Sequence, residues 1–148
     1  METTKPSHYL RMALVLVAFS FAGCATISSF DQYAYIQSTS LKVDALNMMD
    51  LAQNNFSTNE KAVLEFQTKM QKAYEYEKNR PKNEITVRQW DLLMDTTGHL
   101  LGGFIERWKK EQKLNSVYIT EKKKQVSTAF DLISGLESKK INPTNISQ

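Results

Sequence analysis

Few side chains in this sequence have types and spacing that suit catalysis or metal binding. The 148 residues include one cysteine, Cys24, and two histidines, His8 and His99. A zinc site usually takes several Cys or His ligands, and a single cysteine cannot close an intramolecular disulfide. We therefore expect no metal site and no cofactor. His99 is interpreted as a surface or loop residue rather than an acid–base catalyst.

Other candidates for chemistry are also better explained by structure. No serine stands in a G-x-S-x-G sequence, and no glycine-rich phosphate loop is present. Thioethers can bind Cu(I), but Met48 and Met70 fall at helical spacing with other apolar residues, which favours a place in a core. No catalytic residue is assigned, and the sequence predicts a protein that is not an enzyme.

Cys24 directly follows an apolar segment near the N-terminus. Lys5 and Arg11 precede that segment, and nearly every residue from Met12 to Gly23 is apolar or small. This order of basic, apolar and small residues is typical of a secretory signal peptide. A permanent transmembrane helix needs about 20 consecutive apolar residues. The uninterrupted run here is shorter, so a signal peptide is the favoured interpretation.

The sequence Phe21-Ala22-Gly23-Cys24 resembles the lipobox of bacterial lipoproteins, in which small residues precede a cysteine that is lipidated after cleavage. That family most often has an aliphatic residue where this chain has Phe21. The resemblance implies that Cys24 becomes the first residue of the mature protein and carries palmitate-like acyl chains. Several chains would hold it on the lipid bilayer, because each buried methylene contributes about 0.8 kcal/mol. It also implies, through Ala25, an outer membrane location facing the periplasm if the cell is Gram-negative.

Two other fates of Cys24 stay open. Gly23 and Ala25 are both small, so an ordinary signal peptidase could cut after Ala25 and release a soluble secreted domain. Alternatively, Cys24 is an apolar residue of an uncleaved anchor. Lipidation is preferred because the sole cysteine stands where that chemistry requires it.

The chain is expected to contain one folded domain, as its length suggests. We divide it into a lipoprotein signal peptide at 1–23, a short lipidated tether at 24–29, a helical domain at 30–140 and a flexible tail at 141–148. Nineteen basic and sixteen acidic side chains give a net charge of +3. This bias is too small to indicate a nucleic-acid partner.

Apolar residues in the domain recur at steps of three, four or seven, the spacing of one helix face. The expected fold is all-α, an antiparallel helical bundle of three long helices plus a shorter helical pair between the second and the last. The predicted core stripes are Phe30, Ala34, Leu41, Ala45, Met48 and Ala52 in the first long helix, Val63, Phe66, Met70, Ala73 and Tyr74 in the second, Leu101, Phe104, Ile105 and Trp108 in the shorter pair, and Ile119, Val126, Ala129, Phe130, Ile133 and Leu136 in the last.

Polar residues mark where these helices should begin. Ser28 or Ser29 is expected to cap the first long helix. The sequence Ser57-Thr58-Asn59-Glu60 fits a capping box for the second, and Thr86 with Gln89 fits one for a helix that begins just after Thr86.

The segment from 97 to 108 is the apolar part of the chain least committed to the long helices. Gly102 and Gly103 interrupt it, which favours a close helix approach or a kink. Because exposed apolar surfaces usually mark interfaces, we hypothesise that this segment contributes a surface for a partner or ligand. Its residues are His99 at the polar rim, Leu100, Leu101, Phe104 and Trp108. The competing interpretation places Leu101, Phe104 and Trp108 in the core.

The sequence therefore favours a membrane-anchored helical lipoprotein of the bacterial cell envelope with a structural or partner-binding role. Its expected partners are the lipid bilayer, through acylated Cys24, and an envelope protein of unknown identity. The alternative is an envelope protein that binds a small ligand in a pocket near residues 86–113.

Overall fold

The computed structural model describes residues 28–138 and 141, and this part of the chain is all-helical. Its elements are α2 (Gln32–Asp50), the short 3-10 turn η1 (Leu51–Gln53), α3 (Phe56–Lys78), α4 (Glu84–Met94), α5 (Leu101–Glu111) and α6 (Ser116–Glu137). The helical fold class expected from the sequence is thus confirmed. None of the described helices is long and apolar enough to cross a membrane.

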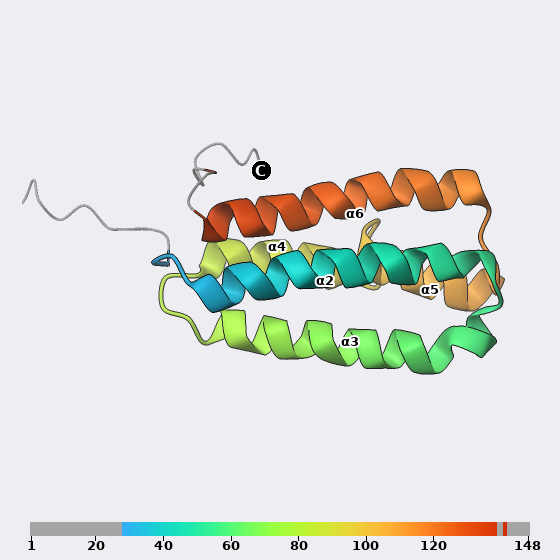
Figure 1. Cartoon of the computed structure of the whole chain (residues 1–148), viewed down its shortest axis with the longest axis horizontal. Helices are drawn as coiled ribbons and strands as arrows, with labels where there is room; N and C mark the ends of the chain where they lie inside the picture. The colour runs from blue at the N-terminus through green and yellow to red at the C-terminus, as the bar shows by residue number, and fades with distance from the viewer. Residues whose placement is uncertain (1–27, 139–140, 142–148) are drawn as a thin grey trace, which may run out of the picture.

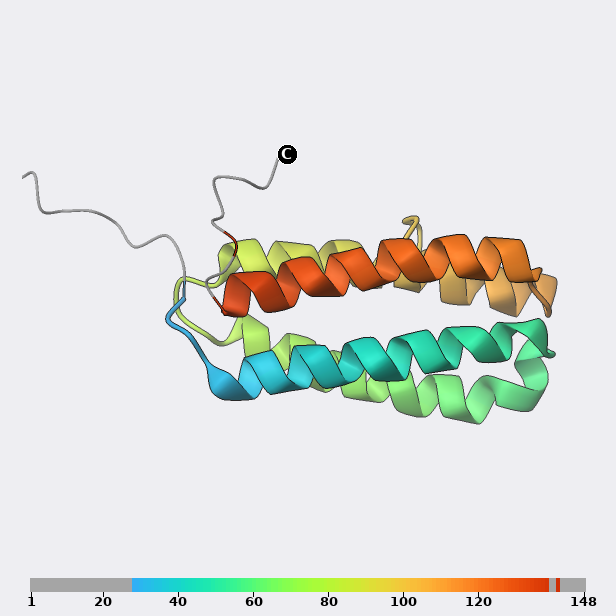
Figure 2. The same cartoon turned by 45° about the horizontal axis from the view of Figure 1, so that its top comes forward.

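The three long helices α2, α3 and α6 lie side by side, and α4 and α5 follow one another along the remaining side (Figure 1). The chain runs out along α2, back along α3, out again through α4 and α5, and back along α6 (Figure 2). The beginning of α2, the connection at 79–83 and the end of α6 therefore share one end of the molecule, which we call the tether end. η1 and the beginning of α6 lie at the far end.

Four aromatic side chains form the centre of the core. Trp90, Phe104, Trp108 and Phe130 are each fully buried. Trp90 packs edge-on against Phe130 with ring centroids 6.0 Å apart, and Phe56 packs edge-on against Trp108 at 5.2 Å. These contacts join helices that are distant in sequence, so one core is shared by all five helices.

The predicted core stripes are almost all buried. Two of their residues, Tyr74 and Ala129, are only partly buried and pack against the core. The prediction that Phe30 belongs to the core is wrong. Phe30 precedes α2 and is 52% exposed. The cap of α2 is Asp31, whose carboxylate accepts a hydrogen bond from the amide of Ala34 at 3.0 Å. Ser28 and Ser29 lie before this cap.

The two predicted capping boxes are also corrected. α3 begins at Phe56, after Asn55, so Ser57-Thr58-Asn59-Glu60 forms its first turn rather than its cap. α4 begins at Glu84, and Thr86 is buried within its first turn. Tertiary packing has extended each helix beyond its local start signal, because the added residues bury side chains such as Phe56.

Gly102 and Gly103 lie where α4 meets α5, and they permit the close approach expected from the sequence. A Cβ atom on Gly102 would overlap the backbone carbonyl of Met94, and one on Gly103 would overlap that of Gly98. Backbone atoms cannot rotate away as a side chain can, so only glycine fits at these two positions. The pair lets α5 begin directly against the end of α4.

Candidate functional site

The structure separates the residues that the sequence grouped into one docking surface. Leu101, Phe104 and Trp108 are 2%, 0% and 0% exposed, and they belong to the core. The indole Nε1 of Trp108 donates hydrogen bonds to the carbonyl of Asn54 at 3.0 Å and to that of Gln112 at 3.1 Å. The prediction that these three residues form an exposed surface is therefore wrong. The competing interpretation from helical spacing, which places these three residues in the core, is confirmed.

The other two residues of that group lie outside the core. His99 is exposed in the α4–α5 connection, and its backbone carbonyl accepts a hydrogen bond from Lys122 at 2.8 Å. Leu100 is half-buried and packs against the core. Hydrogen bonds from Thr97 lower the pKa of Asp95, and the charge of His99 contributes to the lowering, so the acid–base neighbour of His99 is a carboxylate that is itself bound to the connection.

A groove of about 260 Å³ lies between α3 and the α4–α5 junction. Its walls are mainly apolar, and its polar groups are two glutamines of α3 and a threonine of the connection. The lining residues are Phe66, Gln67, Met70, Gln71, Met94, Thr96, Leu101, Gly102 and Ile105. The sequence analysis placed a ligand pocket near residues 86–113. One wall of this groove comes from that region, and the opposite wall comes from α3.

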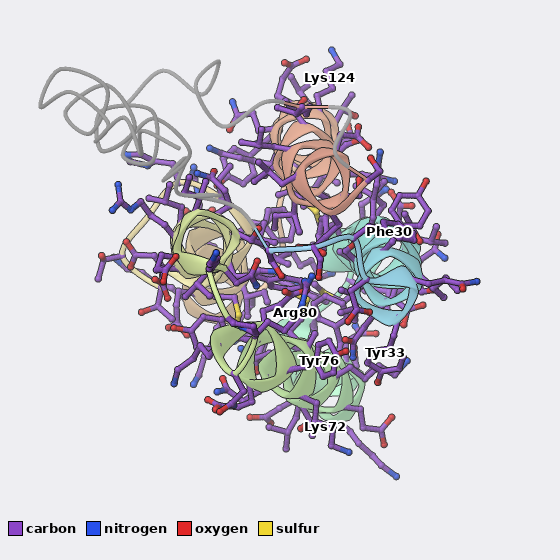
Figure 3. All side chains as sticks on the ribbon, turned by 90° about the vertical axis from the view of Figure 1, so that its left-hand side faces the viewer. Phe30, Tyr33, Lys72, Tyr76, Arg80 and Lys124 are labelled. Atoms are coloured by element: carbon purple, nitrogen blue, oxygen red, sulfur yellow. The ribbon has the colours of Figure 1, made fainter. Side chains whose placement is uncertain are left out.

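A second candidate site is a buried ionic cluster at the tether end, which we call the Arg80 cluster (Figure 3). Arg80 follows α3, and its side chain is only 8% exposed. Its Nη1 donates to Glu77 Oε2 at 2.7 Å and to Glu137 Oε2 at 2.6 Å. Glu77 and Glu137 come from the ends of α3 and α6 and are almost fully buried. One guanidinium thus links two long helices.

Arg80 also holds the beginning of the described chain. Its Nη2 donates to the backbone carbonyl of Ser29 at 2.9 Å, and its Nε lies 3.8 Å from Asp31 Oδ2. Asp31 in turn caps α2 and accepts a hydrogen bond from the Tyr76 hydroxyl at 2.7 Å. The arrangement ties the residues just before α2 to the ends of α3 and α6.

Burial and the neighbouring charges shift the pKa values of two groups in the Arg80 cluster. Burial raises the pKa of Glu137, the charge of Glu77 adds to the rise, and the hydrogen bond from Arg80 acts against both. Burial by itself would lower the pKa of Arg80, but hydrogen bonds to Glu137 and Glu77 outweigh that effect and raise it. Asn83 completes the cluster by donating to Glu77 Oε2 at 2.6 Å.

Sequence reasoning missed the Arg80 cluster, although a signal was present. Glu77 continues the buried stripe of α3 four residues after Ala73, and Glu137 continues that of α6 four residues after Ile133. A carboxylate at a core position needs a cation. Arg80 also follows the end of a helix, where a cation is favourable against the helix dipole, and this weaker and more local effect accounts for its position without any buried partner.

Cys24, the predicted lipidation site, lies outside the described residues. Four peptide units separate it from Ser28, the first described residue. The nearest part of the described structure is therefore the tether end.

Comparison of the chain with protein-family models, with curated proteins and with solved structures finds no significant match. The function must accordingly be argued from this chain's own residues.

Proposed function

We propose that this chain is a lipid-anchored helical protein of the bacterial cell envelope with a structural or protein-binding role and no catalytic activity. Its domain is an antiparallel bundle of three long helices and a shorter pair, carried on an acylated Cys24. The observation that carries the proposal is the lipobox-like Phe21-Ala22-Gly23-Cys24 after a basic and then apolar leader. It stands four residues before the described domain begins.

The Arg80 cluster suits an anchored domain. A force on the tether would reach the bundle at Ser29 and Asp31, the residues that Arg80 holds. Because Arg80 is also bound to Glu77 and Glu137, the load would be shared by the ends of α3 and α6. The beginning of α2 would then resist fraying, which is common where chain ends are not tied down.

Mass spectrometry of the protein from the membrane fraction tests the anchor. The N-terminus should be an acylated Cys24, and Cys24→Ser should leave an uncleaved or soluble chain. Ser28→Ala is the matched control, because it changes a nearby residue without removing the acceptor thiol, and its processing should be normal. An unmodified N-terminus at Thr26 would contradict lipidation and replace it with simple secretion.

A protein-binding role is supported by the outer face of α2. Ile36 and Val43 stand seven residues apart, on the side of the helix opposite the buried Leu41 and Ala45, and they are 51% and 58% exposed. These two exposed side chains are the apolar groups that a partner helix could contact on this face of α2.

A photo-crosslinking residue in place of Val43 tests this role in living cells. We expect a discrete crosslinked product with an envelope protein. The control is the same replacement at Gln125, an exposed polar position on α6, which should give none. Absence of a product at both positions would count against a partner on this face.

The groove between α3 and the α4–α5 junction favours a second candidate function, the binding of a small apolar ligand. Its mainly apolar walls, with a few polar groups among them, are typical of a ligand site, and its volume of about 260 Å³ limits the ligand to one smaller than a drug-sized molecule. Native mass spectrometry of the protein purified from its own cells should then show a bound small mass. Met94→Trp, which would fill the groove, should reduce that mass, whereas Leu92→Trp on the exposed side of α4 should not. A chain that carries no added mass would contradict ligand binding.

A further inference from the structure

Three aromatic rings are exposed at the tether end, and we call them the tether-end patch. Phe30 is 52% exposed, Tyr33 57% and Tyr76 37%. Tyr33 of α2 and Tyr76 of α3 contact edge-on, with ring centroids 4.9 Å apart. All three are labelled in Figure 3, which looks directly at this end of the bundle. Phe30 lies apart from this pair, with its ring centroid 6.5 Å from that of Tyr35. Three exposed rings at one end of a bundle need an explanation beyond the core.

The patch is held in place by the polar contacts behind it. The Tyr76 hydroxyl donates to Asp31, and Asp31 caps α2. Phe30 lies directly between Ser29, whose carbonyl Arg80 binds, and Asp31. Asp31 therefore fixes the Tyr76 hydroxyl, and the Tyr33 ring packs against Tyr76, so that ordering these two rings on a surface would cost little conformational entropy.

The covalent distance to the anchor limits where the patch can lie. A chain spans at most about 3.3–3.6 Å per residue. The four peptide units from Cys24 to Ser28 therefore place Ser28 within about 14 Å of the anchored residue. With acyl chains on Cys24, Ser28 would always remain within that distance of the anchored residue, and Phe30 and Tyr33 follow it closely in the chain.

We propose that the tether-end patch rests on the lipid bilayer itself, with its rings at the level of the headgroups. This inference depends on the proposed lipidation of Cys24. Tyrosine is enriched at the membrane interface because its ring is apolar and its hydroxyl polar. The anchor keeps the patch at a high local concentration beside the bilayer, so weak contacts suffice. Three rings are also a small area for a stable protein interface, which buries about 1,200–2,000 Å² in total.

Lipid contact would fix the orientation of the domain. The bundle would stand on its tether end, and the far end with the α5–α6 connection would point away from the membrane. Ile36 and Val43, on the outer face of α2, would remain available to a protein.

Single-cysteine labelling of the mature protein tests this inference. Tyr33→Cys and, separately, Phe30→Cys introduce a thiol into the patch, and Val117→Cys introduces one at the far end, where Val117 is 73% exposed. Each residue is exposed, so the variants should fold. Cys24 is the only natural cysteine. Each variant should therefore take one environment-sensitive fluorophore if Cys24 is acylated and two if it is free.

The labelled proteins are placed in vesicles of phosphatidylethanolamine and phosphatidylglycerol, and iodide in the water is used as a quencher. We expect blue-shifted emission and several-fold weaker quenching for labels at 30 and 33 than for the label at 117. Equal quenching at all three positions in protein that floats with the vesicles would overturn the lipid contact while leaving the anchor intact.

Two further outcomes are decisive. Protection in native membranes but not in pure lipid vesicles would assign the patch to a protein and overturn the lipid contact. Protein that does not float would overturn both the lipidation of Cys24 and the inference that depends on it, whether it carries two labels because Cys24 is free or one because cleavage after Ala25 has removed Cys24.

Discussion

At the scale of single residues, the Arg80 cluster is the feature with the largest expected energetic effect. Two almost fully buried carboxylates share one guanidinium, and the Asn83 amide also donates to Glu77. Removal of one partner from a buried ion pair typically costs about 3–5 kcal/mol, because an uncompensated charge is left behind. The unfolding of this protein should therefore be sensitive to Arg80 in a way that depends on pH.

We expect Arg80→Ala to lower the free energy of unfolding by about 3–5 kcal/mol at pH 7. Without the cation, the pKa of Glu137 should rise further above its ordinary value. A carboxyl whose folded pKa is raised contributes stability below its unfolded pKa and loses it as the pH rises through the folded value. The loss should accordingly be smaller at pH 5 than at pH 7.

Urea denaturation followed by circular dichroism at both values measures this effect. The pKa of Asp31 is lowered, mainly by the Tyr76 hydrogen bond, so Asp31 stays ionised at both pH 5 and pH 7. Its titration therefore does not contribute to the difference in unfolding free energy between the two pH values. Arg88→Ala removes an exposed arginine of α4 and should change little. An Arg80→Ala loss that is equal at the two pH values would contradict the proposed role of the charge.

At the scale of elements, the junction of α4 and α5 depends on its two glycines. A methyl group on Gly102 would meet the backbone of Met94 and Asp95. We expect Gly102→Ala to destabilise the protein by about 1–3 kcal/mol, as overpacking does, although Ala is the better helix former by about 1 kcal/mol.

Gly135→Ala on α6 is the matched control. There a methyl group would meet only the side chain of Ile141, which can move aside. This change should be neutral or mildly stabilising, since it replaces glycine within a helix. Thermal unfolding of both variants measures the two effects. A Tm for Gly102→Ala above that of the wild type would contradict the packing argument.

At the scale of the whole molecule, the shared core predicts that the domain unfolds as one unit. The two tryptophans, Trp90 on α4 and Trp108 on α5, are fully buried and contact residues of α6 and α3 respectively. A chain of residues 26–148 should be predominantly helical and should melt in a single transition without added metal. Circular dichroism and tryptophan fluorescence should report the same midpoint. Two separated transitions would show that α4–α5 and the long helices unfold independently.

The helical class, most of the core and the close approach at the glycine pair were predictable from the residues alone. Each follows from local information, because a helix places residues three and four apart on one face whatever surrounds it. Val63, Phe66, Met70 and Ala73 are buried as that spacing predicts. The lipidation of Cys24 is also a prediction from local sequence, and it lies outside the described residues.

The exposure of particular apolar residues and the burial of particular charges depend on how the helices pack, and a local pattern does not contain that information. Phe104 and Trp108 are core because α3 and α6 cover them, and Phe30 is exposed because it precedes α2, which begins at Gln32 after the Asp31 cap. The Arg80 cluster joins Arg80 to a carboxylate 57 positions away in the sequence. A local pattern can place a carboxylate on a core face, but it cannot say which distant cation will neutralise it, because that depends on how the helix ends meet.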